Sequence, residues 1–377
     1  MRHQDEKVGT IVIGGGQAGL ATGYHLAHRG LPFVILDASG RVGDAWRKRW
    51  DSLRVFTPAR FNGLPGMPFP GPRHSFPSKD EVADYLEAYA ARFELPVRSG
   101  TRVHRVSKTE HGFEVAAGDR VWHANNVVVA MATDQVPRIP SFAGNLDPDI
   151  LQLNTANYRN PTQLDDGPAL VVGAGNSGAE IALDITPHHQ TYLSGRHPGH
   201  VPFRVEGRSG RVFVPLVIGF AFHRVVTVRT PIGRKVRPKL LSHGKSLIRT
   251  KPKDLVAAGV ERVPRVTGVE NGRPLLEDGR VVDVRNVIWC TGFRPDFSWI
   301  DLDIFGGQDD PIEPVHERGI VPSEPGLYFV GLFFLYAGSS ELLRGVGRDS
   351  EHIVSHIAKH RPGAVLESSR PVHAAAR

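Results

Sequence analysis

The chain has very little cysteine and no long apolar segment, and both absences narrow its function. Cys290 is the one cysteine among 377 residues. A single cysteine excludes an intrachain disulfide, a redox-active CxxC pair and a metal site built from several cysteines. The longest nearly apolar run, residues 212–222, contains Pro215 and Gly219. It is far shorter than the ~18–20 residues that cross a bilayer, so no transmembrane segment is expected.

Targeting and metal-binding signals are also missing from the sequence. Residues 1–7 are polar and charged and lead directly into an apolar run. No signal peptide is therefore expected, and the protein is predicted to be cytoplasmic. The 18 histidines form no HExxH pattern, so we predict no metal site.

The charge balance is basic, with 46 Lys and Arg against 39 Asp and Glu and a formal net charge of +7. Such a balance is typical of proteins that bind nucleic acid, membranes or anionic small ligands. Basic residues are dense between Arg204 and Lys253, but aromatic residues do not alternate with them as in a single-stranded nucleic-acid platform. We interpret this stretch as a solvated basic surface, expect no nucleic-acid partner, and leave its role open.

One structural pattern occurs twice along the chain. Residues 8–13 are apolar and β-branched, a glycine-rich turn follows, and residues 17–29 have helical spacing before a second strand at 33–36. The same order recurs in residues 169–193. Each repeat is predicted to be a βαβ unit with parallel strands.

The other segments complete the predicted α/β fold. Residues 101–123 are expected to form a small antiparallel β insertion, and residues 137–168, rich in Pro, Asn and Asp, a linker. Ser78 and Glu81 predict a capping box for a helix at 79–93. Further elements are expected as strands at 126–130, 260–266, 281–284, 287–289 and 326–330 and a helix at 347–360. The sequence therefore predicts two Rossmann-like dinucleotide-binding domains. The first is formed by residues 1–165 and 290–377, and the second, residues 166–289, is inserted in it.

The first glycine turn, Gly14-x-Gly16-x-x-Gly19, lies between a strand and a helix, where a dinucleotide fingerprint must lie. Gly14 permits the tight turn, Gly16 lets the backbone approach a pyrophosphate, and Gly19 lets the helix pack closely on the strand. Asp37 follows the next strand, 23 residues after Gly14. Its carboxylate can accept hydrogen bonds from ribose hydroxyls and would repel a 2′-phosphate.

The second glycine turn, Gly173-x-Gly175-x-x-Gly178, repeats this arrangement. At the same offset of 23 residues stands Arg196, and its neighbours include no acid. A guanidinium recognises phosphate oxygens through two parallel hydrogen bonds. The second site is therefore predicted to bind NADPH in preference to NADH.

The paired turns, together with Arg-Val-Gly-Asp-Ala-Trp at 41–46, Trp-Asp-Ser-Leu-Arg at 50–54 and Trp-Cys-Thr-Gly-Phe-Arg-Pro at 289–295, resemble the class B flavin-dependent monooxygenases. The resemblance covers nearly the whole chain and is greatest to small bacterial flavin-containing monooxygenase-like proteins. It implies FAD on the first turn and NADPH on the second. It also implies O2 and a small-molecule substrate (an amine, sulfide or ketone), oxygenated through a C4a-(hydro)peroxyflavin. A homodimer is left open.

The resemblance also implies which residues lie along the cofactors. Gly43 and Trp46 would follow the FAD, Thr291-Gly292 would mark the return of the chain to the FAD domain, and Gly331 with the loop 337–340 would lie near the flavin ring. The residues expected to bind cofactors are Gly14, Gly16, Gln17, Ala18, Gly19, Asp37, Gly43, Trp46, Val103, Ala132, Gly173, Gly175, Asn176, Ser177, Gly178, Arg196, Thr291, Gly292, Gly331, Ser339 and Ser340.

One position departs from the family fingerprint between the two turns. Alignment on Tyr158 places Asn154 where the family has histidine. Asparagine can hydrogen-bond but cannot titrate near neutral pH, so coupling of NADPH oxidation to oxygenation does not follow from the sequence. Asn154, Thr57 and Asn62 are the candidate catalytic residues. Two alternatives stay open: an FAD/NAD(P)H reductase or uncoupled oxidase, and a non-catalytic flavin-binding regulatory protein.

Overall fold

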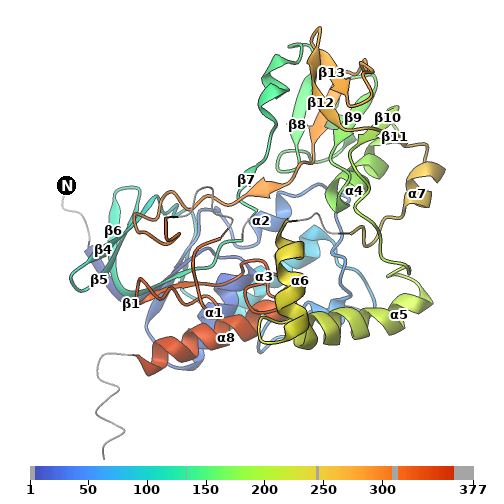
Figure 1. Ribbon diagram of the computed structural model, residues 1–377. Coiled ribbons are helices and arrows are strands. Elements are labelled where there is room, and N and C mark those ends of the chain that lie inside the picture. Colours follow the sequence, from blue (N-terminus) through green and yellow to red (C-terminus); the bar gives the residue numbers. More distant parts are fainter. Residues whose placement is uncertain (1–4, 133, 243–245, 308–312, 361–377) are drawn as a thin grey trace, which may run out of the picture.

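A computed structural model describes residues 5–132, 134–242, 246–307 and 313–360. Lys245, one of the basic residues of the 204–253 stretch, lies outside these ranges. The described chain forms two sheets with parallel strands, connected by a short paired segment (Figure 1). The predicted fold class, α/β with two Rossmann-like units, is confirmed.

The first sheet has parallel strands at its centre. Its order is β3 (Val97–Arg98), β2 (Phe33–Leu36), β1 (Asp5–Ile13), β6 (Arg120–Val129), β5 (Gly112–Ala117) and β4 (Arg105–Thr109), and β16 (Leu327–Phe329) also pairs with β6. The helices of this unit are α1 (Gln17–His28), α2 (Asp44–Arg47), α3 (Lys79–Arg92) and α8 (Leu343–Lys359). Ile11 and Val12 at the centre of β1 are fully buried, as expected for a strand covered on both faces.

The antiparallel strands differ from the prediction of a separate insertion. Strand β6 is one continuous strand, where two short strands were expected. One edge of β6 pairs in parallel with β1 along most of its length; on the other edge, its first half pairs with β5 in antiparallel fashion and its second half pairs with β16 in parallel. The hairpin β4–β5 is therefore an extension of the first sheet.

The second sheet is entirely parallel, in the order β11 (Glu261–Val263), β10 (Thr191–Ser194), β9 (Ala169–Val172), β14 (Asn286–Trp289) and β8 (Leu151–Asn154). Helix α4 (Asn176–Ile185) packs on it, with Ile181 and Ile185 fully buried. The expectation of a plain linker at 137–168 is wrong, because β8 is the edge strand of this sheet and pairs with β14.

An antiparallel hairpin, β12 (Val266–Glu270) and β13 (Arg273–Leu276), adjoins the second sheet. Asn271 and Gly272 form its turn with φ angles of 49° and 74°. Both angles are positive, as the type I′ hairpin turn requires, and Asn-Gly is a favoured pair in that turn. The strand expected at 281–284 is reduced to a bridge between Leu275 and Val281.

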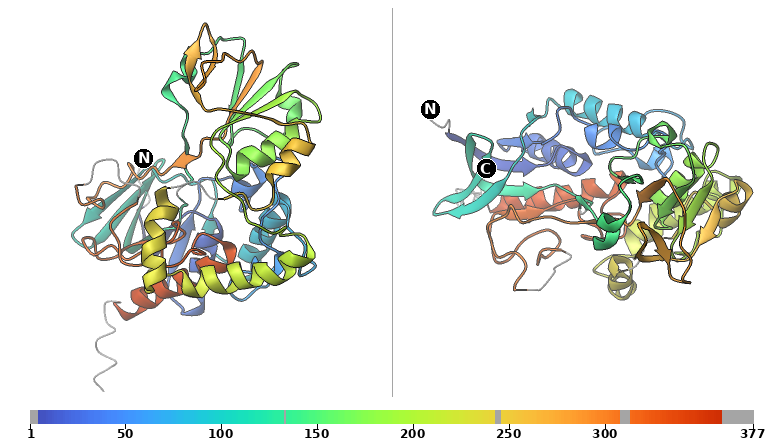
Figure 2. Two further views of the ribbon diagram at one scale, coloured as in Figure 1. Left: turned by 45° about the vertical axis from the view of Figure 1, so that its right-hand side comes forward. Right: turned by 90° about the horizontal axis from the view of Figure 1, so that it is seen from above.

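The basic stretch folds into α5 (Arg208–Val214), a π-helix (Pro215–Val225), α6 (Pro231–Ser242) and α7 (Pro252–Ala257). Helix α5 runs along the lower edge of the molecule, and α6 stands upright near the start of α8 (Figures 1 and 2). Short 3-10 turns occupy Ala59–Phe61, Ser141–Asn145 and Pro161–Gln163. The capping box predicted for α3 is present: the Ser78 hydroxyl accepts from the Glu81 N–H, and the Glu81 carboxylate accepts from the Ser78 N–H.

Two short strands join the sheets. Strand β7 (Val136–Pro137) pairs in antiparallel fashion with β15 (Phe293–Arg294). Beside them, the Arg138 N–H donates to the Gly292 carbonyl over 2.9 Å. The chain thus leaves for the second sheet and returns from it at one place, as expected for an inserted unit.

Candidate functional site: two matched glycine turns

The first glycine turn has the backbone geometry that its sequence predicts. Gly14 has a φ of 107°, which favours glycine, and its N–H donates to the Leu36 carbonyl over 2.8 Å. A Cβ at Gly19 would overlap the Gly14 carbonyl oxygen. At Gly16, by contrast, an added Cβ would find no atom within 4 Å. Gly14 and Gly19 are therefore required by the fold, and Gly16 faces open space.

The second glycine turn repeats this geometry closely. Gly173 has a φ of 115° and donates to the Ser194 carbonyl over 2.9 Å. A Cβ at Gly178 would overlap the Gly173 carbonyl oxygen, whereas one at Gly175 would meet nothing within 4 Å. The two sheets present the same turn at the same place, between β1 and α1 in the first and between β9 and α4 in the second.

Both turns can accept a phosphate. Gly16 and Gly175 are the N-caps of α1 and α4, and neither helix has a side chain that caps it. The first N–H groups of a helix lack partners within the helix and bind anions readily. The open space beside Gly16 and Gly175 lets a pyrophosphate reach these N–H groups, so the residues present fit a dinucleotide at each turn.

Asp37 is held firmly at the end of β2. Its carboxylate accepts hydrogen bonds from the N–H of Gly15 over 2.8 Å and of Ser39 over 2.7 Å. A carboxylate has about four lone-pair sites, so two remain for ribose hydroxyls. Asp37 is therefore oriented by the backbone before any cofactor arrives.

Asp37 and Arg196 lie at the same distance along the sequence from their glycine turns, but they do not occupy equivalent positions in the structure. Asp37 follows directly after β2, whereas Gly195 follows directly after β10, and Arg196 is one residue further on. Helix α4 is two residues shorter than α1 and the connection after it is one residue longer, which shifts the count by one. Gly195 thus replaces the acid, and the exposed Arg196 stands next to it. This arrangement removes the carboxylate that would repel a 2′-phosphate.

The residues expected along the FAD connect α1, α2 and α8. Gly43 has a φ of 89° and lies so close to Ala83 that a Cβ would come within 2.6 Å of the Ala83 carbonyl. The Trp46 indole N–H donates to the Gln17 side chain over 3.3 Å, and the Gln17 amide donates to the Glu341 carbonyl over 3.3 Å. Gln17, at the start of α1, therefore links Trp46 with the segment before α8.

The loop before α8 is closely packed on the first turn. Gly331 has a φ of 86°, and a Cβ there would lie 2.9 Å from the Ala18 side chain. The Ser340 hydroxyl accepts from the N–H groups of Tyr336 and Ala337, each over 3.0 Å. Ser339 is fully buried, so both serines hold the shape of this loop.

Four other predicted residues lie at the edges of the two sites. Asn176 bridges to the chain after α6, because its side chain donates to the Ser246 carbonyl and accepts from the Ile248 N–H. Ser177 is half-buried in the first turn of α4. Val103 packs against the core of the first sheet, and the exposed Ala132 follows β6, next to β1.

The predicted Thr291-Gly292 pair lies at the crossing between the sheets. The Thr291 hydroxyl donates to the Arg138 carbonyl, which fastens the two crossing strands together. Cys290, just before it, is buried, and burial raises the pKa of its thiol to about 12. This thiol is protonated at neutral pH and cannot act as a thiolate nucleophile.

The candidate catalytic residues are engaged in local turns. The buried Thr57 hydroxyl donates to the Asn62 side chain over 2.5 Å, and the Asn62 amide donates to the Thr57 carbonyl over 2.9 Å. The structure brings these two residues together. Asn154 lies apart from them at the end of β8, where its side chain accepts from the Ala156 N–H over 2.9 Å.

Arginines that the sequence did not indicate gather around Phe61. The guanidinium carbons of Arg60 and Arg344 lie 4.8 Å and 5.1 Å from the centre of the Phe61 ring. The Nε of each is buried without a hydrogen-bond partner. Burial lowers the pKa of Arg344, and nearby Arg224 lowers it further. These residues come from three distant segments, so no local pattern could have revealed them.

His223 of the π-helix faces this same region. Its Nδ1 forms a hydrogen bond with the Ser339 hydroxyl over 2.9 Å. Burial lowers the pKa of His223 to about 4, and the positive charges of Arg348 and Arg344 add to this effect. His223 is therefore neutral at pH 7.

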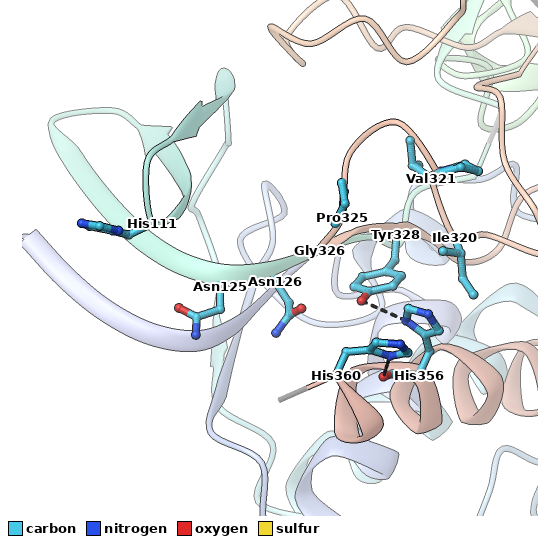
Figure 3. Close-up of a pocket in the computed structure, with 11 residues that line it drawn as sticks. His111, Asn125, Asn126, Ile320, Val321, Pro325, Gly326, Tyr328, His356 and His360 are labelled. Atoms are coloured by element: carbon cyan, nitrogen blue, oxygen red, sulfur yellow. Dashed lines mark hydrogen bonds between the residues drawn. The ribbon is translucent and has the colours of Figure 1, made fainter. Parts of the chain in front are cut away.

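A surface cavity of about 500 Å³ lies elsewhere, between β6, the start of β16 and the end of α8 (Figure 3). Asn126, Tyr328 and His356 line it, and the Tyr328 hydroxyl pairs with His356 Nδ1 over 3.2 Å. It is lined by none of the glycine-turn residues. Unlike this cavity, the two turns offer unpaired backbone N–H groups that suit phosphates.

The described residues also bear on a metal centre and on a membrane-spanning helix. Within the described ranges, no group of three or more His, Cys, Asp or Glu side chains could hold a metal ion. Among the same residues, every helix is too short or too polar to cross a bilayer.

Known proteins match both the sequence and this geometry. Residues 11–197 match the family described as pyridine nucleotide-disulphide oxidoreductase. A CzcO-like oxidoreductase of Geobacillus kaustophilus is 38% identical over 355 residues, which cover 94% of this chain and 99% of that protein. The probable indole-3-pyruvate monooxygenase YUCCA3 of Arabidopsis thaliana is 28% identical over 86% of this chain and 82% of its own length.

A solved structure extends the match to the whole fold. The flavin-containing monooxygenase from Stenotrophomonas maltophilia is 28% identical and has a TM-score of 0.76, covering 94% of this chain and 99% of that one. The chain belongs to the pyridine nucleotide-disulphide oxidoreductase family. It is an oxidoreductase of the flavin-monooxygenase-like kind, which does not agree with the alternative of a non-catalytic regulatory protein. An internal dithiol–disulphide cycle is excluded, since Cys290 is the sole cysteine.

Proposed function

We propose that the protein is an FAD- and NADPH-dependent monooxygenase that oxygenates a small amine, sulfide or ketone. The observation that carries the proposal is the pair of matched turns, one beside Asp37 and the other beside Gly195 and Arg196. The first suits the ribose of FAD, and the second suits a 2′-phosphate. Residues 1–165 and 290–377 would form the FAD domain and 166–289 the NADPH domain, with β8 added to the latter.

Each part of the chain has a task in this reaction. The substrate, O2, NADPH and a proton give the oxygenated substrate, NADP+ and water. Bound FAD supplies the hydride acceptor and the oxygen chemistry. The glycine turns hold the two pyrophosphates, Asp37 orients the FAD ribose, and Arg196 binds the 2′-phosphate. Ser339, Ser340 and the π-helix enclose the flavin end and keep water away.

The named activities of the relatives support oxygenation. Both the Stenotrophomonas and the Arabidopsis proteins are monooxygenases by name. The specific observation that favours a second candidate, an uncoupled oxidase or a reductase, is Asn154. It replaces the expected histidine, and its side chain is used within its own turn. The two functions differ in where the oxygen goes.

Measuring where the oxygen atoms go distinguishes a monooxygenase from an oxidase or a reductase. The purified holoenzyme is given NADPH and 18O2 with panels of amines, sulfides and ketones, and product, peroxide and NADP+ are measured together. We expect one 18O atom in the product for each NADPH consumed with an accepted substrate, and little peroxide. Peroxide equal to NADPH with every compound would make the protein an oxidase. Fast anaerobic reduction of a quinone or a ferredoxin, without oxygenated product, would make it a reductase.

A further inference from the structure

The stretch 207–253 has an unusual composition that the proposed function does not explain. It contains 12 Lys and Arg residues and no Asp or Glu. Several of these cations have local partners, such as Arg237, which pairs with Glu313. Others, including Arg208, Arg211 and Arg224, are exposed and form no ion pair with any acid in the described ranges.

The same stretch carries large apolar side chains that are exposed to solvent. Val212, Phe213, Leu216 and Phe220 have exposed fractions of 67%, 45%, 56% and 52%. Val212, Leu216 and Phe220 follow one another at a spacing of four residues along α5 and the π-helix that continues it, which places them in one row, and Phe213 lies next to Val212. We call these four side chains the apolar ridge.

The opposite side of these two helices packs on the protein. Val214 is 1% exposed, and the π-helix lies so close to the Phe61 ring that a Cβ at Gly219 would be 3.2 Å from it. Phe222 meets the backbone at Gly338. The inner face therefore holds the helices in place, and the ridge is not needed for their packing.

Exposed cations flank the apolar ridge. Arg208, Arg211 and Arg224 belong to α5 and the π-helix, and Arg234 and Lys235 belong to α6. Ile232 at the start of α6 is also 56% exposed. Both helices lie at the surface of the molecule in Figures 1 and 2. An apolar row bordered by Lys and Arg is typical of a helix that lies in the interface of a bilayer.

We propose that the apolar ridge docks the protein on an anionic lipid surface. Val212, Leu216 and Phe220 would enter the boundary between headgroups and acyl chains, and the flanking arginines would contact acidic headgroups. This docking is peripheral and does not depend on the oxygenation reaction.

Charge decides against a second copy of the chain as the occupant. In a two-fold dimer each copy presents the same patch to the other, so the arginines that flank the ridge would face their equivalents. Like charges brought together across an interface cost several kcal/mol. An anionic membrane relieves this repulsion, and it also accepts the apolar side chains, which a nucleic acid backbone does not.

Vesicle binding tests this proposal with the full-length flavoprotein. Sedimentation compares vesicles of phosphatidylcholine with vesicles that contain 40% phosphatidylglycerol, at low salt and at high salt. We expect binding to the anionic vesicles, at least tenfold weaker binding to the neutral ones, and release by high salt. Removing two cations with Arg208→Gln and Arg211→Gln should weaken binding roughly 20-fold, on the basis of roughly fivefold for each cation. The double variant Leu216→Gln/Phe220→Gln should weaken it at least tenfold.

Matched variants elsewhere control for surface changes in general. Val256→Gln removes an apolar side chain of α7 that is 70% exposed, and Arg102→Gln/Arg120→Gln removes two exposed cations, one just before β4 and one at the start of β6. Neither should change vesicle binding by more than about twofold. Flavin content and the melting temperature verify that each variant is folded. The variants Arg208→Gln and Arg211→Gln keep the test valid if the variant Leu216→Gln/Phe220→Gln is unstable.

Three results would overturn the proposal. The first is equal binding to neutral and anionic vesicles, or no binding to either. The second is a concentration-dependent dimer in light scattering that the Leu216→Gln/Phe220→Gln variant dissolves, since a second copy would then cover the ridge. The third is salt-sensitive binding to nucleic acid that exceeds binding to anionic vesicles.

Discussion

Adding one methyl group to each glycine turn should separate the two cofactors. Gly175 has a φ of −74° and nothing within 4 Å of an added Cβ, so the variant Gly175→Ala should fold normally. Gly-to-Ala changes at such positions stabilise proteins by ~0.4–1 kcal/mol. The methyl group would, however, occupy the space that the pyrophosphate must enter. Gly16, with a φ of −78° and the same open space, gives the matching variant Gly16→Ala in the first turn.

The expected magnitude follows from the hydrogen bonds that are lost. A hydrogen bond to a charged group contributes roughly 1.5–3 kcal/mol, and the methyl group should remove at least one to the phosphates. This loss corresponds to about 10- to 150-fold weaker binding. Gly175→Ala should therefore raise the Kd for NADP+ by this factor and keep its flavin, whereas Gly16→Ala should lose flavin on purification.

Calorimetric titration of NADP+, flavin absorbance and thermal melting are the three assays. Gly178→Ala is the control, because its Cβ would overlap the Gly173 carbonyl oxygen and should destabilise the fold itself. A Gly175→Ala protein that binds NADP+ within twofold of the wild type would refute the assignment of that turn. So would a Gly16→Ala protein that keeps full flavin occupancy.

Three further outcomes can be measured. Arg196→Ala should raise KM for NADPH roughly tenfold or more and leave KM for NADH unchanged, in steady-state kinetics of both cofactors; equal changes would contradict the 2′-phosphate contact. Tyr158→Phe removes the half-buried 2.8 Å hydrogen bond to the Asp184 carboxylate and should cost roughly 1.5–3 kcal/mol in urea unfolding, with no effect on flavin content. The folded-state pKa of His223, about 4, is below its ordinary value, so its contribution to stability is present above pH ~6.5 and is lost as pH falls towards 4. His223→Gln should therefore flatten the decline in melting temperature between pH 7 and 5; an unchanged decline would count against this reading.

The glycine turns could be predicted because each glycine is required by the local backbone geometry. Gly14 and Gly173 need positive φ, and Gly19 and Gly178 need room beside a carbonyl oxygen. These demands depend on a few neighbouring residues, so they leave a fixed spacing in the sequence. The start of helix α3 could be predicted for the same reason, because its capping box depends only on Ser78 and Glu81.

Features that depend on distant partners could not be predicted. The offset from Gly173 to Arg196 placed the arginine one residue too early, because the glycine turn does not fix the length of the helix and of the connection that follows it. Strand β8 was hidden in a polar segment, since its pairing with β14 joins residues more than 130 positions apart. The arginines around Phe61 come from separate segments, and only the folded chain brings them together.

Because β7 and β15 are paired where the chain crosses between the sheets, the second sheet is a self-contained insert in the first unit. The chain enters and leaves it at one place, where β7 pairs with β15 and hydrogen bonds join Arg138 to Gly292 and to Thr291, so the unit could be exchanged without threading one loop through another. Its removal would change the surroundings of Trp50, which is 4% exposed and packs in the core of the second unit, because this side chain would become exposed to water. The fluorescence of Trp50 therefore reports whether the second unit is packed against the first.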